Sequence, residues 1–211
     1  MHGSGVLAVW NDCQRGSEET YESWYQTEHL PERLGVPGFK RGRRYQALEG
    51  SPEFFTWYEV ESPSVLRSAE YINCLSNPTP WTKQIMSGVF LNASRTVCKR
   101  HIIAGELFGS IAVTIRLEAD ASDQDIQETL DATYDPARVA RIEKWVADEE
   151  RGDEAKAEEQ IRGPDEKIKI CFILETIREE DARMIASELL KKSIRAEIGI
   201  YNLLCEYPRL L

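Results

Sequence analysis

A glutamate and a histidine follow three aromatic residues along one face of a helix predicted near the start of the chain. Tyr21, Trp24 and Tyr25 are spaced i, i+3 and i+4, and the same face continues to Glu28 and His29. A buried carboxylate or imidazole needs a hydrogen-bond partner, a ligand or a water-filled pocket, because leaving it unpaired costs free energy or shifts its pKa. We therefore predict that these side chains line a ligand pocket.

His29 is the natural candidate for acid–base chemistry in that pocket. The pKa of an unperturbed imidazole, about 6.5, makes both protonation states available at neutral pH. We predict that His29 is a catalytic general acid or base and that Trp24, Tyr25 and Glu28 bind the ligand.

A structural role for the same two polar residues is the alternative. His29 comes just before Pro31, where an imidazolium would interact favourably with the dipole at the end of the helix. Glu28 would then form an ion pair with Arg33 at the surface, which would contribute little to stability.

Two predicted strands supply side chains that could complete the pocket. Alternation places Arg41, Arg43 and Tyr45 on one side of the first strand and Phe55, Trp57 and Glu59 on one side of the second. Arg44 or Tyr45 could stabilise an enolate-like oxyanion; they point to opposite faces, and we assign this role to Tyr45. Trp57 is predicted to bind the ligand, and Trp81 either closes the entrance or is a hydrophobic plug. Aromatic pockets with a few polar groups are typical of small-ligand sites.

The elements that position these residues occur in the same order in both halves of the chain. The first half contains strands at 6–10, 39–48, 54–60 and 89–97, with helices that begin at Ser17 and Pro63. The second half contains strands at 110–118, 138–148, 169–177 and 198–205, with helices that begin at Ser122 and Glu179. The segment 138–148 could instead extend a helix, and we interpret it as a strand.

The order β-α-β-β-α-β is the ferredoxin-like plan, whose sheet has helices on one face only. Two such sheets can bury their bare faces against each other. We therefore predict an α+β fold of two tandem ferredoxin-like repeats, residues 1–105 with the candidate site and residues 106–211, packed sheet to sheet as a pseudo-dimeric α+β barrel. The polar stretch 149–167 is predicted to be an enlarged, poorly packed loop in the second repeat.

Composition excludes several classes of function. The net charge is −10, which disfavours nucleic-acid binding. Three histidines and five cysteines lack metal-ligand spacing, so we predict no metal site and no cofactor. No apolar run approaches the roughly 20 residues that cross a bilayer, and the first residues do not have the pattern of a signal peptide. We expect no membrane contact and a cytoplasmic location.

The segment WYQTEHLPERLGVPGFKRGRRY, residues 24–45, joins a helix bearing tryptophan and histidine to a basic, tyrosine-containing strand through PGF. In this it resembles proteins of the dimeric α+β barrel superfamily, and it looks most similar to the EthD-like and stress-responsive A/B-barrel branches. The resemblance implies ferredoxin-like units paired sheet to sheet. Among the sites of these families, it carries over only His29, at the place of the histidine that often ends their first helix. The second half has TYDPARVAR at this place, so we expect that half to be specialised for packing.

The superfamily includes muconolactone isomerases, cofactor-independent monooxygenases and polyketide cyclases, and some of its members bind haem. We predict a small-molecule-binding barrel protein, in one version a cofactor-independent enzyme that moves a proton on a hydrophobic or aromatic carbonyl compound through His29. The alternatives are a non-catalytic ligand carrier or stress-related accessory protein, and a haem-associated barrel protein. Pairing of the two halves within one chain predicts a monomer, with a homodimer as the alternative.

Overall fold

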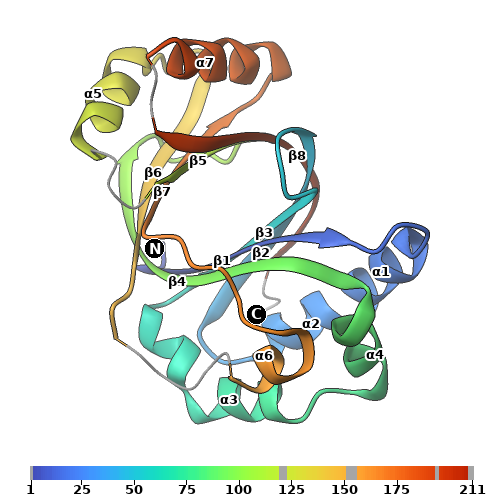
Figure 1. Cartoon of the computed structure of the whole chain (residues 1–211). Helices are drawn as coiled ribbons and strands as arrows, with labels where there is room; N and C mark the ends of the chain where they lie inside the picture. The colour runs from blue at the N-terminus through green and yellow to red at the C-terminus, as the bar shows by residue number, and fades with distance from the viewer. Residues whose placement is uncertain (1, 119–122, 151–155, 193–194, 209–211) are drawn as a thin grey trace.

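The computed structural model describes residues 2–118, 123–150, 156–192 and 195–208, and these form a closed antiparallel barrel with helices on its outer surface (Figure 1). The strands are β1 Gly5–Cys13, β2 Phe39–Glu49, β3 Phe54–Val60, β4 Phe90–Ala104, β5 Ile111–Leu117, β6 Val139–Ala147, β7 Ile170–Thr176 and β8 Ala196–Pro208. Around the barrel they follow the order β1-β3-β2-β8-β5-β7-β6-β4. The predicted α+β class and the barrel are therefore confirmed, as is the strand interpretation of 138–148.

The pairings β2 with β8 and β4 with β6 join the two halves of the chain into one barrel. Within the first half the strand order is β4-β1-β3-β2, and within the second it is β6-β7-β5-β8. Each sheet therefore continues into the other at both of its edges, and the barrel is closed within a single chain.

Helices of the first half cover the outer face of its sheet. They are α1 Glu18–Trp24, the π-helical turn η1 Tyr25–His29, α2 Leu30–Gly35, the 3-10 turn η2 Pro63–Arg67, α3 Ala69–Ser76 and α4 Pro80–Gly88. The helix predicted to begin at Pro63 is thus three separate elements. The division follows local capping. The hydroxyl of Ser68 accepts a hydrogen bond from the backbone N–H of Tyr71, and the hydroxyl of Thr79 accepts one from that of Thr82, so a new helix begins at each place.

The second half carries α5 Asp123–Thr133 and α7 Glu179–Lys191 on its own sheet, whereas α6 Lys156–Arg162 lies beside α3 and α4 of the first half (Figure 1). The prediction of a poorly packed loop is wrong for 156–167, because Glu158 is 7% exposed and Ile161 packs against the first-half core. Residues 151–155 lie outside the described part of this segment. The sequence prediction missed α6 because its packing depends on charges rather than on an apolar stripe.

Alternation along the strands divides the buried residues into three clusters. One cluster draws on all eight strands and on no helix, so it fills the barrel interior. The other two lie on the outer faces, each between one sheet and its helices. A residue of the first-half sheet therefore faces either the interior or the helices. None of the described helices is both long and apolar enough to cross a membrane.

Candidate functional site

His29 is held against the first-half sheet by the π-helical turn η1. The backbone N–H of Leu30 donates to the carbonyl of Tyr25, five residues back, and Pro31, which follows, has no N–H to continue regular α-helical bonding. This wider turn keeps Trp24 and His29 together, with ring centroids 4.3 Å apart, although residues five apart point in different directions in a regular α-helix. The centroid of the Tyr25 ring lies 5.0 Å from that of His29 and 5.3 Å from that of Trp24, so the three rings form one cluster. The predicted aromatic surroundings of His29 are confirmed for these two residues.

A cavity of about 20 Å³ lies between this helix and the sheet, and His29 lines it. Aromatic residues form part of its wall, among them Tyr25, Tyr58, Tyr71 and Phe90. A water molecule needs roughly 10–15 Å³ of such volume, so the cavity has room for about one water. An aromatic ligand would need the cavity to widen.

The imidazole of His29 is neutral at physiological pH. Burial, and secondarily the positive charge of Arg33, lowers the pKa of His29 well below its usual value. Its Nδ1 is buried and has no hydrogen-bond partner in the described part of the chain. Because an unmet hydrogen bond at a buried nitrogen is costly, Nδ1 marks a position where a polar ligand atom or a water would be stabilised.

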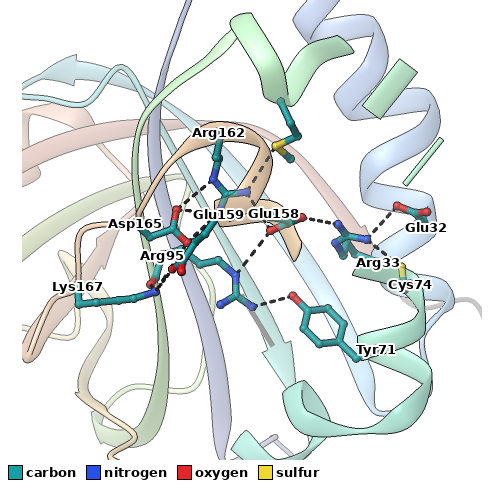
Figure 2. A network of polar contacts seen from close by, with 11 residues as sticks. Glu32, Arg33, Tyr71, Cys74, Arg95, Glu158, Glu159, Arg162, Asp165 and Lys167 are labelled. Carbon is teal, nitrogen blue, oxygen red and sulfur yellow. Dashed lines mark hydrogen bonds and ion pairs between the residues drawn. The ribbon is translucent and has the colours of Figure 1, made fainter. Parts of the chain in front are cut away.

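Charged residues close the same cavity on the side of α6 (Figure 2). Glu158 lies between Arg33, whose Nη2 donates to Oε1 at 2.8 Å, and Arg162, whose Nη1 donates to Oε2 at 3.0 Å. The Nε of Arg95 is 4.0 Å from the same carboxylate. Burial alone would raise the pKa of Glu158, but the three arginines outweigh it and hold the pKa well below its usual range. The carboxylate is therefore ionised within a cluster of arginines.

Glu28 connects the first helix to α4 rather than pairing with Arg33. Its Oε1 accepts from Thr79 Oγ1 at 2.5 Å and from Thr82 Oγ1 at 2.8 Å. The Nε1 of Trp24 donates to the same Thr82 hydroxyl at 3.0 Å. Arg33 instead pairs with Glu32 and Glu158. The contacts of Glu28 thus fix the position of Trp24 beside His29.

Trp81 begins α4 and is partly buried against the first-half core. It is not among the residues that line the His29 cavity. The arrangement corresponds to the hydrophobic plug that the sequence offered as one alternative for this residue.

Tyr45 and Trp57 lie inside the barrel, on the opposite face of the sheet from His29. The Tyr45 hydroxyl donates to Glu175 Oε1 at 2.8 Å, and the Trp57 ring lies 5.6 Å from that of Trp145. The expectation that they share a pocket with His29 is wrong. Neighbouring residues on a strand face opposite sides, and it is Arg44 and Tyr58 that face the helices here.

The barrel interior holds a second set of buried charges at one end. Glu175 accepts from Arg43 and Tyr45, and Glu143 accepts from Arg100 at 2.6 and 2.7 Å. The strand alternation predicted that Arg41, Arg43 and Glu59 would share a face, and Arg41 does contact Glu59 at 2.9 Å. Arg141 pairs with Glu143 through Nε, whereas its Nη1 and Nη2 are buried without a hydrogen-bond partner among the described residues, so the charges at this barrel end are only partly compensated.

A wider cleft of about 600 Å³ lies where β1 and β5 end, and its lining includes Asp12, Asn92, Arg116, Glu166 and Glu197. Its arginine Arg116 is already paired, because the Nη2 donates to Glu197 and to the Ser51 carbonyl. No group of three or more potential metal ligands occurs among the residues that the structure describes. The His29 cavity, with its unpartnered nitrogen, is the better candidate.

Sequence reasoning missed Arg95, Glu158 and Tyr71. Arg95 lies between Ser94 and Thr96 in a strand with several polar residues, so the sequence did not distinguish it. Glu158 gave no signal, because it belongs to a polar segment that is distant in sequence from the first-half residues of the site.

No known protein family matches this sequence, and no curated protein matches it. Solved structures are similar over nearly the whole chain. A Fusobacterium nucleatum protein assigned as a monooxygenase has a TM-score of 0.57 and 10% identity, covering 99% of this chain and 96% of its own. An anthrone oxidase-like protein has a TM-score of 0.55 and 9% identity, with 97% and 92% covered.

A haem-binding protein from Thermus thermophilus is also similar, with a TM-score of 0.51, 10% identity, and coverage of 97% of this chain and 92% of its own. At such identities the likeness concerns the fold. The chain is thus similar in fold to these α+β barrel proteins.

Proposed function

We propose that this chain binds a hydrophobic or aromatic small molecule between the first-half helices and their sheet, beside His29. One observation carries the proposal: a neutral imidazole, which is buried among aromatic rings and has an unpartnered Nδ1, lines a cavity. Aromatic and apolar walls with a few polar groups are typical of small-molecule sites. The structural neighbours include proteins named as monooxygenase, anthrone oxidase-like and haem-binding, which supports a barrel that binds small molecules.

The chemistry that fits this site is proton transfer next to a carbonyl group. The neutral His29 takes a proton from the carbon beside the carbonyl, the electrons of the broken C–H bond move onto the carbonyl oxygen, and His29 later returns the proton. Tyr58 lines the same cavity, and burial, followed by the nearby Tyr25, raises its pKa well above the usual value. Its hydroxyl therefore stays protonated and can donate to the oxyanion, the role that the sequence assigned to Tyr45.

Haem is a weaker candidate, although similar barrels include haem-binding proteins. An imidazole such as that of His29 can ligate haem iron. The cavity of about 20 Å³ does not admit a porphyrin, and α6 with its ion pairs fills the adjoining space. The residues present in this arrangement do not fit the group, and we derive no step through it.

We also infer a division into two ferredoxin-like repeats, 1–105 and 106–211. Each half has the strand order fourth-first-third-second, and Gly105, with φ of +73°, lies just after β4. The barrel closes within one chain, which supports a monomer with an internal pseudo-dimer. The cysteines Cys13, Cys74, Cys98, Cys171 and Cys205 are free thiols, in keeping with the cytoplasmic location expected from the sequence.

The proposal is tested by exchange of the α-protons of 2-tetralone, a neutral aromatic ketone, in deuterated water, followed by NMR. We expect the wild-type chain to accelerate the exchange and His29→Ala to abolish this acceleration. The variant should lose about 1 kcal/mol of stability or less, because removal of a desolvated, unpartnered nitrogen offsets the lost packing.

The matched control is His101→Ala, since His101 is exposed on β4. It should exchange tetralone protons at the wild-type rate. If His29→Ala stays folded and keeps the wild-type rate, the catalytic proposal fails. If tetralone binds to the wild-type chain without exchange, the non-catalytic carrier is the better description.

A further inference from the structure

Glu158 reaches the His29 site from the other half of the chain. Two of the three arginines around it, Arg33 on α2 and Arg95 on β4, belong to the first half, whereas Glu158 belongs to α6, within the β6–β7 connection (Figure 2). Both arginines are nine-tenths or more buried, with exposures of 3% each. The site therefore consists of a fixed pair of guanidinium groups and a carboxylate delivered by a separate segment.

Without that carboxylate the first half would hold excess positive charge at the cavity. Glu32 is the first-half carboxylate paired with Arg33, and the Tyr71 hydroxyl, which accepts from Arg95 at 3.0 Å, carries no charge. His29 is neutral and adds none. Arg33 and Arg95 carry two positive charges and Glu32 carries one negative charge, so one positive charge is left without compensation. A buried excess charge of this kind favours an anionic partner.

The remaining charges of the segment are largely compensated within it. Arg162 donates to Asp165 through Nε and Nη2, at 2.8 to 3.0 Å, and to Glu158 through Nη1. Lys167 lies 3.4 Å from Glu159. The backbone of Glu166 is hydrogen-bonded to β4, so α6 would swing about this end of the segment, where Arg162 can keep Asp165 as its partner. Such a movement would leave Arg33 and Arg95 facing the opened cavity.

We propose that Arg33 and Arg95 recognise a carboxylate on the ligand, and that Glu158 occupies their site when no ligand is bound. This inference rests on the proposed function, because the aromatic part of the ligand would lie beside His29. It specifies the ligand class as aromatic carboxylates. Binding exchanges one carboxylate for another at the two guanidinium groups and displaces α6, which gives the cavity of about 20 Å³ the room that it lacks.

The test compares 1-naphthoate with its neutral isostere 1-naphthamide, using full-length chains and the quenching of tryptophan fluorescence. Glu158→Gln removes the internal charge and keeps the size of the side chain. We expect it to tighten naphthoate binding by about tenfold or more, and naphthamide binding clearly less, since a charge-assisted hydrogen bond is worth that factor. Glu159→Gln, one residue along α6, is the matched control and should bind both probes as the wild type does.

A second variant identifies the receptor. Adding Arg95→Gln to Glu158→Gln should abolish the preference for naphthoate, and thermal unfolding checks that the double variant folds. If it does not fold, hydrogen exchange on the wild-type chain decides: saturating naphthoate should speed amide exchange across Lys156–Arg162, and naphthamide should not.

The outcomes separate the two proposals. If both probes bind, but Glu158→Gln gives no preference for naphthoate and α6 exchange is unchanged, the carboxylate inference is wrong while the proposed function survives. If neither probe binds to any of the variants, both fail. A naphthoate preference that survives Arg95→Gln in a folded chain would overturn the assignment of the receptor.

Discussion

The two outer faces of the barrel are packed with different chemistry. The cluster of the first half contains eight buried aromatic residues, Tyr21, Trp24, Tyr25, Phe39, Phe54, Tyr58, Tyr71 and Phe90. In the corresponding cluster of the second half, Phe172 is the buried aromatic residue, and the others are Ile, Leu, Val and Ala. Both faces consist of helices on an antiparallel sheet, so the second half shows that hydrocarbon side chains are sufficient to cover such a sheet. The aromatic and charged residues of the first half are therefore not required by the fold.

Buried charge follows the same division. Arg44 lies over the rings of Tyr25 and Phe54, at 4.4 and 4.7 Å, and its guanidinium pairs with Glu22. Together with Arg33 and Arg95 it places three arginines under the first-half helices. Such groups are costly to bury without partners, which suggests that the first face is maintained for binding and the second for stability.

The largest expected effect would come from breaking the charged cluster of the first face. Arg33→Met leaves Glu158 buried without its closest first-half partner, and we expect a loss of about 3–5 kcal/mol in the free energy of unfolding. Combining it with Glu158→Leu should restore most of that stability, because paired hydrophobic residues avoid the desolvation of both charges. Urea unfolding of the two variants measures this. Equal stability of the wild type and Arg33→Met would show that the cluster is not energetically coupled.

A truncation on the second face should affect stability and nothing else. Ile185 on α7 is 1% exposed, and Ile185→Ala should cost about 2–5 kcal/mol through the lost contacts and the cavity left behind. Under conditions where the variant is folded, its affinity for 1-naphthamide should equal that of the wild type. A several-fold change in this affinity would mean that the two faces are energetically coupled. The first face could then not be assigned to binding and the second to stability.

The smallest expected effect is a pH dependence of stability that comes from His29 on the first face. The pKa of His29 is lowered in the folded chain, so below about pH 6.5 the unfolded state takes up a proton that the folded state does not. The contribution that neutral His29 makes to the free energy of unfolding is therefore fully present above pH 6.5. It is lost as the pH falls toward the lower pKa that His29 has in the folded chain. Between pH 7 and 5.5 this loss should be about 1 kcal/mol.

The control for the pH effect is His29→Gln, which lacks the titrating group. The pKa of His2 is also lowered, mainly by burial, but His2 is present in both chains, so the difference between them reports His29. Unfolding free energies measured at the two pH values decide. Identical pH dependence in the two chains would indicate that His29 has the same pKa in the folded and unfolded states.

Local patterns predicted most of the fold. The strand 54–60 was predicted with the bounds that the structure has, because its aromatic and β-branched residues are typical of strands. The surroundings of His29 could be predicted in part, since Trp24 and Tyr25 are near it along one helix. The pairing of Tyr45 with His29 could not, because the sequence did not indicate which face of the sheet the helices cover.

What the sequence could not supply was the contribution of distant segments. Glu158 is ordered by Arg33, Arg95 and Arg162, and two of these are more than 60 residues away along the chain. Composition alone assigns such a polar stretch to a loop. Its packing is a property of the assembled fold, and only the three-dimensional arrangement shows it.

The closure of the barrel also bears on how the chain is made. β2 is complete by residue 49, yet its second neighbour, β8, begins only at Ala196. During synthesis the backbone N–H and C=O groups on that edge of β2 remain unpaired until nearly all of the other strands have left the ribosome. Unprotected strand edges promote association between chains, and pairings this distant in sequence slow folding. The seam between β2 and β8 is therefore where a nascent chain is most vulnerable to aggregation and where a chaperone would be of most use.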